Sequence, residues 1–138
     1  MALAENSGKE IPFAFNRKEK KEHGEGGSMV GADLVGDIAI IDDVITAGTA
    51  IRESFEIIDA AGAKACAVFL ALDRQERGQK DGQPTETSAI QQVESEFGIP
   101  VVAIATFSDL IDYLKKQEDQ AEQLEKMQSY REQYGIDS

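Results

Sequence analysis

Several features that would settle the class of a protein are scarce in this sequence. There is one cysteine, Cys66, which lies within an apolar run, and no apolar run approaches the roughly 20 residues of a membrane span. The first residues have neither the basic region nor the apolar region of a signal peptide. We therefore expect a cytoplasmic protein in which Cys66 is a buried small hydrophobic residue and not a reactive thiol.

Positive charge is also scarce. The chain has 14 lysines and arginines against 26 aspartates and glutamates, which gives a formal net charge of −12. This balance argues against general binding of nucleic acid, which requires a basic surface. Four of the five residues at 17–21 are nevertheless basic. Positive charge concentrated in this way indicates a small anionic ligand.

What the sequence does contain is an alternation of apolar strands and amphipathic helices. Its 138 residues suit one domain, and a hydrophobic content of 41% is enough for a core. The pattern predicts strands at 12–15, 38–42, 65–72 and 100–105, and helices at 1–8, 49–61, 85–97, 107–114 and 118–134. This order predicts an α/β fold with a mostly parallel sheet flanked by helices, in which ligands bind beyond the carboxyl ends of the strands.

Two polar pairs follow directly on predicted strands. Asp42 and Asp43 end the strand at 38–42, and Asp73 and Arg74 follow the strand at 65–72. Because the carboxyl ends of parallel strands share one edge of the sheet, the two pairs should meet there. Adjacent carboxylates repel each other, so Asp42 and Asp43 need a cationic or hydroxyl-bearing partner. The simpler alternative is that they are turn or helix-cap residues.

The turn after Asp43 has the composition of a phosphate-binding loop. Residues 46–50, Thr-Ala-Gly-Thr-Ala, offer backbone N–H groups and two hydroxyls, and the next helix directs its positive end to the same point. The sequence has neither a Walker loop nor a GxGxxG fingerprint. A single glycine between threonines suits a compact monophosphate. A magnesium-dependent receiver domain is a weaker alternative, because its acidic residues come from different strands.

Residues 40–52 resemble the motif that binds phosphoribosyl pyrophosphate (PRPP) in type I phosphoribosyltransferases. Three segments, FNRKEKKEHGEGG at 15–27, DDVITAGTAIRES at 42–54 and LDRQERG at 72–78, resemble orotate phosphoribosyltransferase in the same order and with similar spacing. This resemblance implies transfer of the ribose 5-phosphate of PRPP to orotate, which gives orotidine 5′-monophosphate and pyrophosphate in de novo pyrimidine synthesis. It also implies Mg²⁺ as a cofactor, carried by PRPP and not by direct protein ligands.

The resemblance assigns roles within the motif. Asp42 and Asp43 would hold the 2′- and 3′-hydroxyls of the ribose and stabilise a cationic sugar. Arg74 would bind the orotate carboxylate through its guanidinium fork, with Thr46 close by. Without the family, we would expect Arg74 to form a surface ion pair with Asp73 or Glu76. The residues that would surround the 5′-phosphate are Val44, Ile45, Thr46, Ala47, Gly48, Thr49 and Ala50.

Residues 17–31 match the mobile catalytic loop of the family. There, Arg17, Lys18, Lys21 and His23 would contact the pyrophosphate in the active site of the neighbouring subunit, and the glycines at 24–27 would permit closure. The resemblance makes Lys21 the main electrostatic catalyst, together with the aspartate pair. The expected partners are PRPP, orotate and a second copy of the chain, in a homodimer that shares the loop, and neither nucleic acid nor a membrane.

The sequence departs from the family at its beginning. The family has an N-terminal segment with further orotate and PRPP contacts, and nothing in this chain corresponds to it. We therefore expect one truncated phosphoribosyltransferase core domain, 1–138, with the PRPP motif at 38–54, uncovered apolar surface and little or no activity alone. A non-catalytic regulator that senses PRPP or nucleotides is the alternative. The match of 17–27 to the catalytic loop argues against it, because a sensor does not need a lysine that closes on pyrophosphate.

Overall fold

The chain divides into two compact units, Met1–Val35 and Gly36–Ser138, which are described separately. The computed structural model describes residues 2–16, 29–80, 82–117 and 119–136. The first unit holds α1 (Ala2–Ser7) and two short antiparallel strands, β1 (Ala14–Asn16) and β2 (Met29–Gly31). The strand β2 contains the last three residues of the loop predicted at 17–31, and the remainder of that loop lies outside the described residues.

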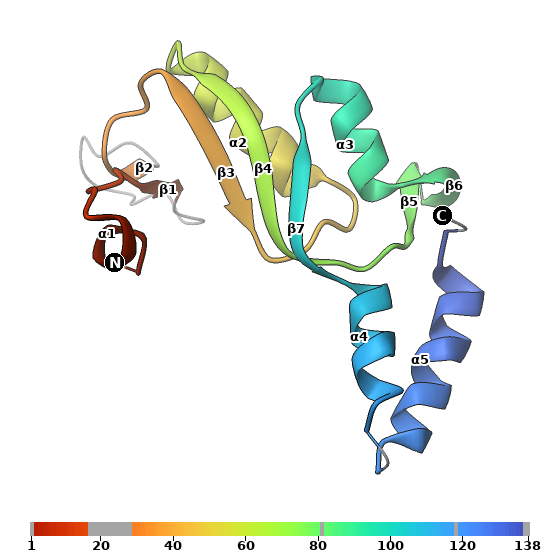
Figure 1. Cartoon of the computed structure of the whole chain (residues 1–138). Coiled ribbons are helices and arrows are strands. Elements are labelled where there is room, and N and C mark those ends of the chain that lie inside the picture. The colour runs from red at the N-terminus through yellow and green to blue at the C-terminus, as the bar shows by residue number, and fades with distance from the viewer. Residues whose placement is uncertain (1, 17–28, 81, 118, 137–138) are drawn as a thin grey trace, which may run out of the picture. The chain divides into compact units, whose positions relative to one another are not determined.

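Three parallel strands form the sheet of the second unit, in the order β3-β4-β7. They are β3 (Asp37–Asp42), β4 (Lys64–Asp73) and β7 (Val101–Thr106). The connecting helices α2 (Thr49–Ala60) and α3 (Ala89–Phe97) lie on the same face of this sheet (Figure 1). The predicted α/β fold with a parallel sheet and flanking helices is therefore confirmed.

The core lies between this sheet and the two helices. Its most deeply buried side chains are Val68 and Leu70 from β4, Ile51 from α2 and Val93 from α3. The ring of Phe55 in α2 stacks on that of Phe97 in α3, with the ring centroids 3.7 Å apart. The two helices therefore pack on each other as well as on the sheet, which fixes the position of their N-termini.

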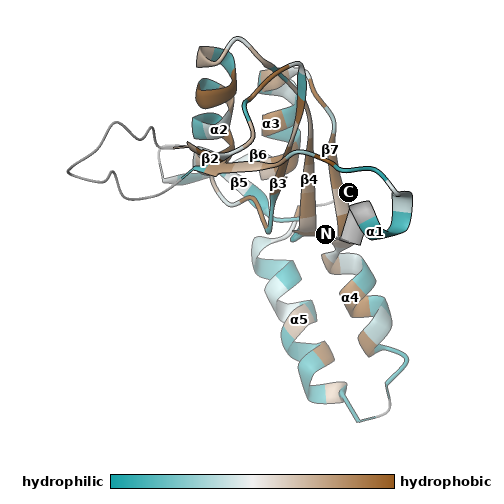
Figure 2. Cartoon of the chain, turned by 90° about the vertical axis from the view of Figure 1, so that its left-hand side faces the viewer, coloured by the Kyte–Doolittle hydropathy of each residue, from teal (hydrophilic) through white to brown (hydrophobic). Residues whose placement is uncertain are grey.

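The other face of the sheet is apolar and open. Its side chains include Ile41, which is 78% exposed, and Ile104, which is 87% exposed. Phe69, the cross-strand partner of Ile41, is 42% exposed, and Val102, the partner of Phe69 on β7, is 48% exposed. Figure 2 shows all three strands coloured mostly as hydrophobic. The predicted uncovered apolar surface is thus present. A face of this kind is normally buried in a soluble protein.

The prediction that Cys66 is buried is wrong, because its side chain is exposed. Ala65 and Ala67 pair with the successive residues Ile38 and Ala39 of β3, so Cys66 is an extra residue at a bulge in β4. An apolar run is buried along its whole length only where both faces of the sheet are covered. In this chain the helices cover one face.

A hairpin that the sequence pattern did not predict lies between β4 and α3. Its strands are β5 (Arg77–Lys80) and β6 (Gln83–Ser88), and they pair antiparallel. The helix predicted at 85–97 consequently begins only at Ala89. The reason is local: the Ser88 hydroxyl accepts from the Gln91 N–H, and the Gln91 side chain accepts from the Ser88 N–H, which together form a capping box.

Two helices end the chain. The predicted helix at 107–114 is confirmed as α4 (Phe107–Leu114), and the last helix is α5 (Ala121–Tyr134). They lie side by side, and the rings of Phe107 and Tyr130 approach to 5.9 Å between centroids (Figure 1). Within the described ranges, no helix combines the length and the apolar character that crossing a membrane would require.

Candidate functional site

The carboxyl end of β3 carries the aspartate pair. The Asp43 N–H donates to Oδ1 of Asp42 at 2.9 Å, and the Val44 N–H donates to Oδ1 of Asp43 at 2.7 Å. The Asp43 carbonyl accepts from the N–H groups of Ala71 and Leu72, both at 3.1 Å. The neighbouring strand β4 therefore fixes the backbone at Asp43, and each carboxylate keeps a second oxygen that can accept from a ligand hydroxyl.

The turn after the aspartates leads into a helix N-terminus that has no side-chain cap. Gly48 is the N-cap of α2, with a left-handed φ of 71°, and no side-chain oxygen bonds to the first turn. The helices α3 and α4 each begin with a capping box instead. Since the first N–H groups of a helix have no acceptor within it, the start of α2 and the hydroxyls of Thr46 and Thr49 together suit an anion.

Arg52 connects this turn to α3. Its Nη1 donates to the Ala47 carbonyl at 2.7 Å, and its Nε and Nη2 donate to the Glu96 carboxylate at 2.7–3.0 Å. The hydrogen bonds from Arg52 lower the pKa of Glu96 below its ordinary value, and those same bonds raise the pKa of Arg52. Both directions favour the charged forms, so the pair stays ionised at neutral pH.

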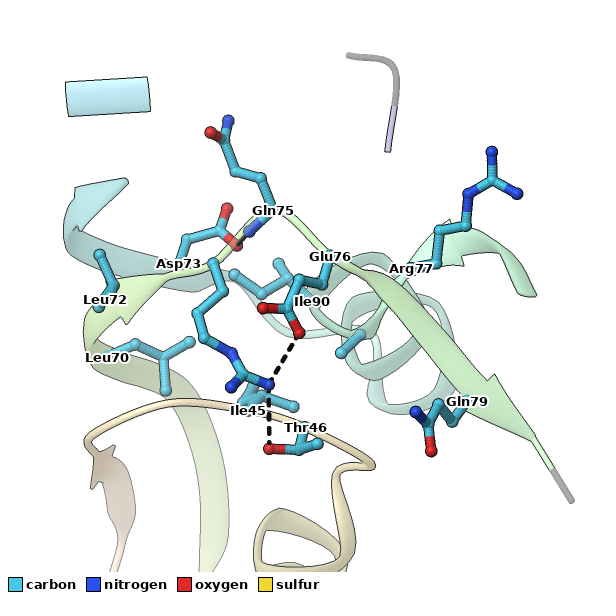
Figure 3. A pocket seen from close by; sticks show the side chains of 12 residues that line it. Ile45, Thr46, Leu70, Leu72, Asp73, Gln75, Glu76, Arg77, Gln79 and Ile90 are labelled. Atoms are coloured by element: carbon cyan, nitrogen blue, oxygen red, sulfur yellow. Dashed lines mark hydrogen bonds and ion pairs between the residues drawn. The ribbon is translucent and has the colours of Figure 1, made fainter. Parts of the chain in front are cut away.

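Arg74 follows the end of β4 and faces the turn. Its Nη2 lies 2.9 Å from Oε2 of Glu76 and 3.4 Å from Oγ1 of Thr46, the two contacts drawn as dashed lines in Figure 3. Its Nε is buried and has no hydrogen-bond partner among the described residues. A buried N–H group without a partner is costly. The guanidinium thus keeps one N–H, at Nε, without an acceptor in the described part of the chain.

Glu76 is held in turn by the last helix. The Tyr130 hydroxyl of α5 donates to Oε1 of Glu76 at 2.8 Å. This hydrogen bond, together with partial burial, raises the pKa of Tyr130 above its ordinary value, so the phenol keeps its proton. A chain of contacts therefore runs from Tyr130 through Glu76 to Arg74, and it holds Nη2, the same nitrogen that lies next to Thr46.

Thr46, Arg74 and Glu76 border one recess with a cavity volume of about 20 Å³, roughly the space of one water molecule. Figure 3 shows that β4, the start of β5, α3 and the turn before α2 supply its walls. Both apolar and polar side chains line it. Its lining residues are Ile45, Thr46, Leu70, Leu72, Asp73, Arg74, Gln75, Glu76, Arg77, Gln79, Ala89 and Ile90.

The structure brings together the parts of the predicted site that it describes. The aspartate pair and Arg74 stand at the carboxyl ends of the adjacent parallel strands β3 and β4, and the turn at 44–50 lies between them along the rim. The predicted loop residues Arg17, Lys18, Lys21 and His23 lie outside the described residues. The ion pair between Arg74 and Glu76 is the one expected for Arg74 without the family. The contacts of Tyr130, Arg52 and Glu96 were not predicted, because each pairs residues from different elements.

Gly48 provides a test of how tightly the turn is built. Alanine at this position is expected to destabilise the fold by about 1–2 kcal/mol, the approximate cost of a left-handed L-residue, and by more through crowding. Its Cβ would lie 3.2 Å from Nη1 of Arg52 and 3.4 Å from Cγ2 of Val93. Gly62→Ala is the matched control, because Gly62 has a φ of 73° with nothing within 4 Å of its added Cβ. Urea denaturation should show the larger loss for Gly48→Ala, and equal losses would argue against crowding.

Comparison with known proteins places this geometry in a family. The chain is 58% identical, over 136 residues, to an orotate phosphoribosyltransferase of Marinobacter nauticus, covering 99% of this chain and 61% of that protein. It is 54% identical to that of Thioalkalivibrio sulfidiphilus, with 99% and 62% covered. The chain belongs to the orotate phosphoribosyltransferase family. It spans about 61% of the length of these relatives. No protein-family profile matches it.

A solved structure agrees with the sequence relation. The crystal structure of an orotate phosphoribosyltransferase from Francisella tularensis superimposes with a TM-score of 0.74 at 37% identity, covering 97% of this chain and 61% of that one. The sheet, its helices and the rim that carries the aspartates are therefore those of the type I phosphoribosyltransferase fold.

Proposed function

We propose that this chain is the PRPP-binding part of an orotate phosphoribosyltransferase, and that the whole protein transfers ribose 5-phosphate from PRPP to orotate. The observation that carries this proposal is the contact between Arg74 and Thr46, with Nη2 and Oγ1 3.4 Å apart. It joins the phosphate turn to a guanidinium that keeps a buried N–H without a partner in the described part of the chain. A sugar phosphate and a carboxylate can then be held next to each other.

In the proposed reaction, positive charge develops on the ribose and negative charge on the departing pyrophosphate. The carboxyl ends of the strands carry groups that can stabilise the positive charge. The bond from C1′ of the ribose to a pyrophosphate oxygen breaks, and a bond from C1′ to a ring nitrogen of orotate forms. Positive charge develops on the ribose, where the carboxylates of Asp42 and Asp43 stabilise it while they accept from its hydroxyls. Arg74 holds the orotate carboxylate, which directs the ring nitrogen to C1′.

The negative charge that develops on pyrophosphate is assigned to other groups. We propose that Lys21 neutralises it, with Arg17, Lys18 and His23 as further contacts, in a homodimer in which each loop serves the partner's site. This assignment rests on the sequence, since these residues lie outside the described part of the chain. A regulator that senses PRPP would not need this loop, and the names of the relatives favour the enzyme.

The donor set at the rim is compatible with magnesium carried by the substrate. No group of three or more histidine, cysteine, aspartate or glutamate side chains gathers around a possible ion position in the described ranges. Mg²⁺ prefers oxygen ligands and often binds through one or two carboxylates, water and substrate phosphates. Because Asp42 and Asp43 are assigned to the ribose hydroxyls, PRPP and water would hold the ion without a direct protein ligand. When bound, the ion would offset charge on the pyrophosphate of PRPP.

The proposal is tested by calorimetric titration of this chain with PRPP in the presence of Mg²⁺. Saturable binding of PRPP and of ribose 5-phosphate is expected, because both carry the 5-phosphate that the turn should hold. Titration with Mg²⁺ alone is the control for heats that do not involve the sugar phosphate. If neither sugar phosphate binds, the assignment of the turn is wrong for this chain.

Activity separates the enzyme from the regulator. The whole protein is expected to release pyrophosphate from PRPP only when orotate is present, whereas this chain alone is expected to release little or none. PRPP binding without orotate-dependent release by the whole protein would support the regulator instead. Release by this chain at near the rate of the whole protein would contradict the expectation that this chain alone has little or no activity.

A further inference from the structure

We infer that Arg52 and Glu96 form a clamp that positions the phosphate turn, so that both are positioning residues for the 5-phosphate site; this inference rests on the proposed function. Three elements meet in the clamp. Arg52 lies in the first turn of α2, Glu96 lies near the end of α3, and the carbonyl that Arg52 holds belongs to Ala47 in the turn.

The geometry of the clamp differs from that of an ordinary surface ion pair. Isolated exposed pairs add little stability, because two long side chains must be ordered in water. The side chains of Arg52 and Glu96 are 38% and 42% exposed, but three hydrogen bonds connect them, with Nε shared between both carboxylate oxygens. Bidentate contacts of this kind fix the plane of the guanidinium. The remaining Nη1 then points at a defined place, the Ala47 carbonyl, at 2.7 Å.

The turn needs such an external contact because it lacks the usual internal ones. Gly48 has a left-handed φ of 71°, and the N-terminus of α2 has no side-chain cap. A residue in this conformation next to an uncapped helix start has few local bonds that would fix the preceding peptide. The Ala47 carbonyl is the acceptor that Arg52 takes, and the peptide N–H of Gly48 belongs to the same rigid peptide plane. Holding the carbonyl therefore fixes the direction of the Gly48 N–H, which is opposite to that of the carbonyl in a trans peptide.

A different role for Arg52 has to be separated from this one. An arginine next to a phosphate turn could bind the phosphate directly. The two roles make opposite predictions for Glu96, because Glu96 neutralises the guanidinium and holds it away from other ligands. If Arg52 contacts phosphate, freeing it from Glu96 should preserve or improve binding. If Arg52 positions the turn, losing Glu96 should weaken binding, although a negative charge is removed.

The experiment measures phosphate affinity and turn rigidity in the same variants of this chain. In Glu96→Gln and Arg52→Met, calorimetry should show about tenfold weaker binding of both PRPP and ribose 5-phosphate. The ¹⁵N backbone order parameters of residues 47–50 should fall from about 0.85 toward 0.6, without ligand, while those in the middle of α2 stay unchanged. Arg52→Lys should resemble Arg52→Met, because an ammonium group cannot hold a carboxylate and a carbonyl in two fixed directions.

A matched control and the contrary outcomes complete the test. Lys126→Met breaks the exposed ion pair between Lys126 and Glu122 on α5 and should change neither quantity. Unchanged order parameters in Glu96→Gln would overturn the clamp, even if the thermal midpoint fell. Wild-type affinity in Glu96→Gln and Arg52→Lys would show a direct phosphate contact instead. If the wild-type chain binds neither sugar phosphate, the proposed function fails, while the order parameters still decide the clamp.

Discussion

Replacing Asp42 and Asp43 together by asparagine is expected to lower kcat of the whole protein by roughly 10²–10³-fold, the range that the loss of one well-aimed electrostatic contact produces in other enzymes. The effect should fall on kcat more than on the KM for PRPP. The reason is that the positive charge on the ribose exists only in the transition state, and an interaction made only there contributes to kcat. Orotate-dependent release of pyrophosphate is the measurement.

Asparagine is the right replacement because it isolates charge from local structure. The Oδ1 atoms of Asp42 and Asp43 accept from the next N–H along the chain, and an amide oxygen can accept in the same way. The backbone at Asp43 is also held by Ala71 and Leu72, so it should not move. Asp37→Asn, at the opposite end of the same strand, is the control and should change kcat by less than about twofold. A double variant that raises KM and leaves kcat intact would show that the aspartates only bind the ribose.

The sequence predicted best those features that depend on neighbouring residues. The strand at 38–42, the helix at 107–114 and the placement of Asp42 and Arg74 at strand ends all follow from short patterns of apolar and polar residues. The resemblance predicted the family, which the apolar and polar patterns alone could not, because it compared three segments of the sequence together. The role assigned to each individual site residue stays a prediction.

The features that were missed depend on contacts between distant residues. The hairpin at 77–88 is polar, and polar strands have no alternation that distinguishes them from a loop. The exposure of Cys66 depends on which face of the sheet the helices cover, which a run of apolar residues does not reveal. Arg52 and Glu96 stand 44 residues apart, and no spacing rule relates them until α2 and α3 pack side by side.

Replacing Arg74 by methionine is expected to raise the KM for orotate by about 100-fold or more, while the KM for PRPP changes little. The guanidinium is the cation at the rim that keeps a buried N–H, its Nε, without a partner in the described part of the chain. Removing one member of a buried, hydrogen-bonded charge pair typically costs about 2–5 kcal/mol, because the other charge is left without its partner. In the proposed site, that other charge is the carboxylate of orotate.

Uracil, which has the ring of orotate without the carboxylate, makes this prediction specific. The wild-type protein should prefer orotate strongly, and Arg74→Met should lose most of that preference by losing orotate turnover, with uracil turnover little changed. Arg77→Met is the control, because Arg77 lines the same recess but directs its Nε to the Gly135 carbonyl at 3.3 Å. The Glu76 carboxylate lies 2.9 Å from Nη2 of Arg74, so the orotate carboxylate must either displace it or share the guanidinium with it. Because Glu76→Gln removes this competing negative charge, the variant should bind orotate at least as tightly as the wild type. An equal loss of orotate and uracil turnover in Arg74→Met would mean that Arg74 supports the fold of the recess and does not recognise the carboxylate.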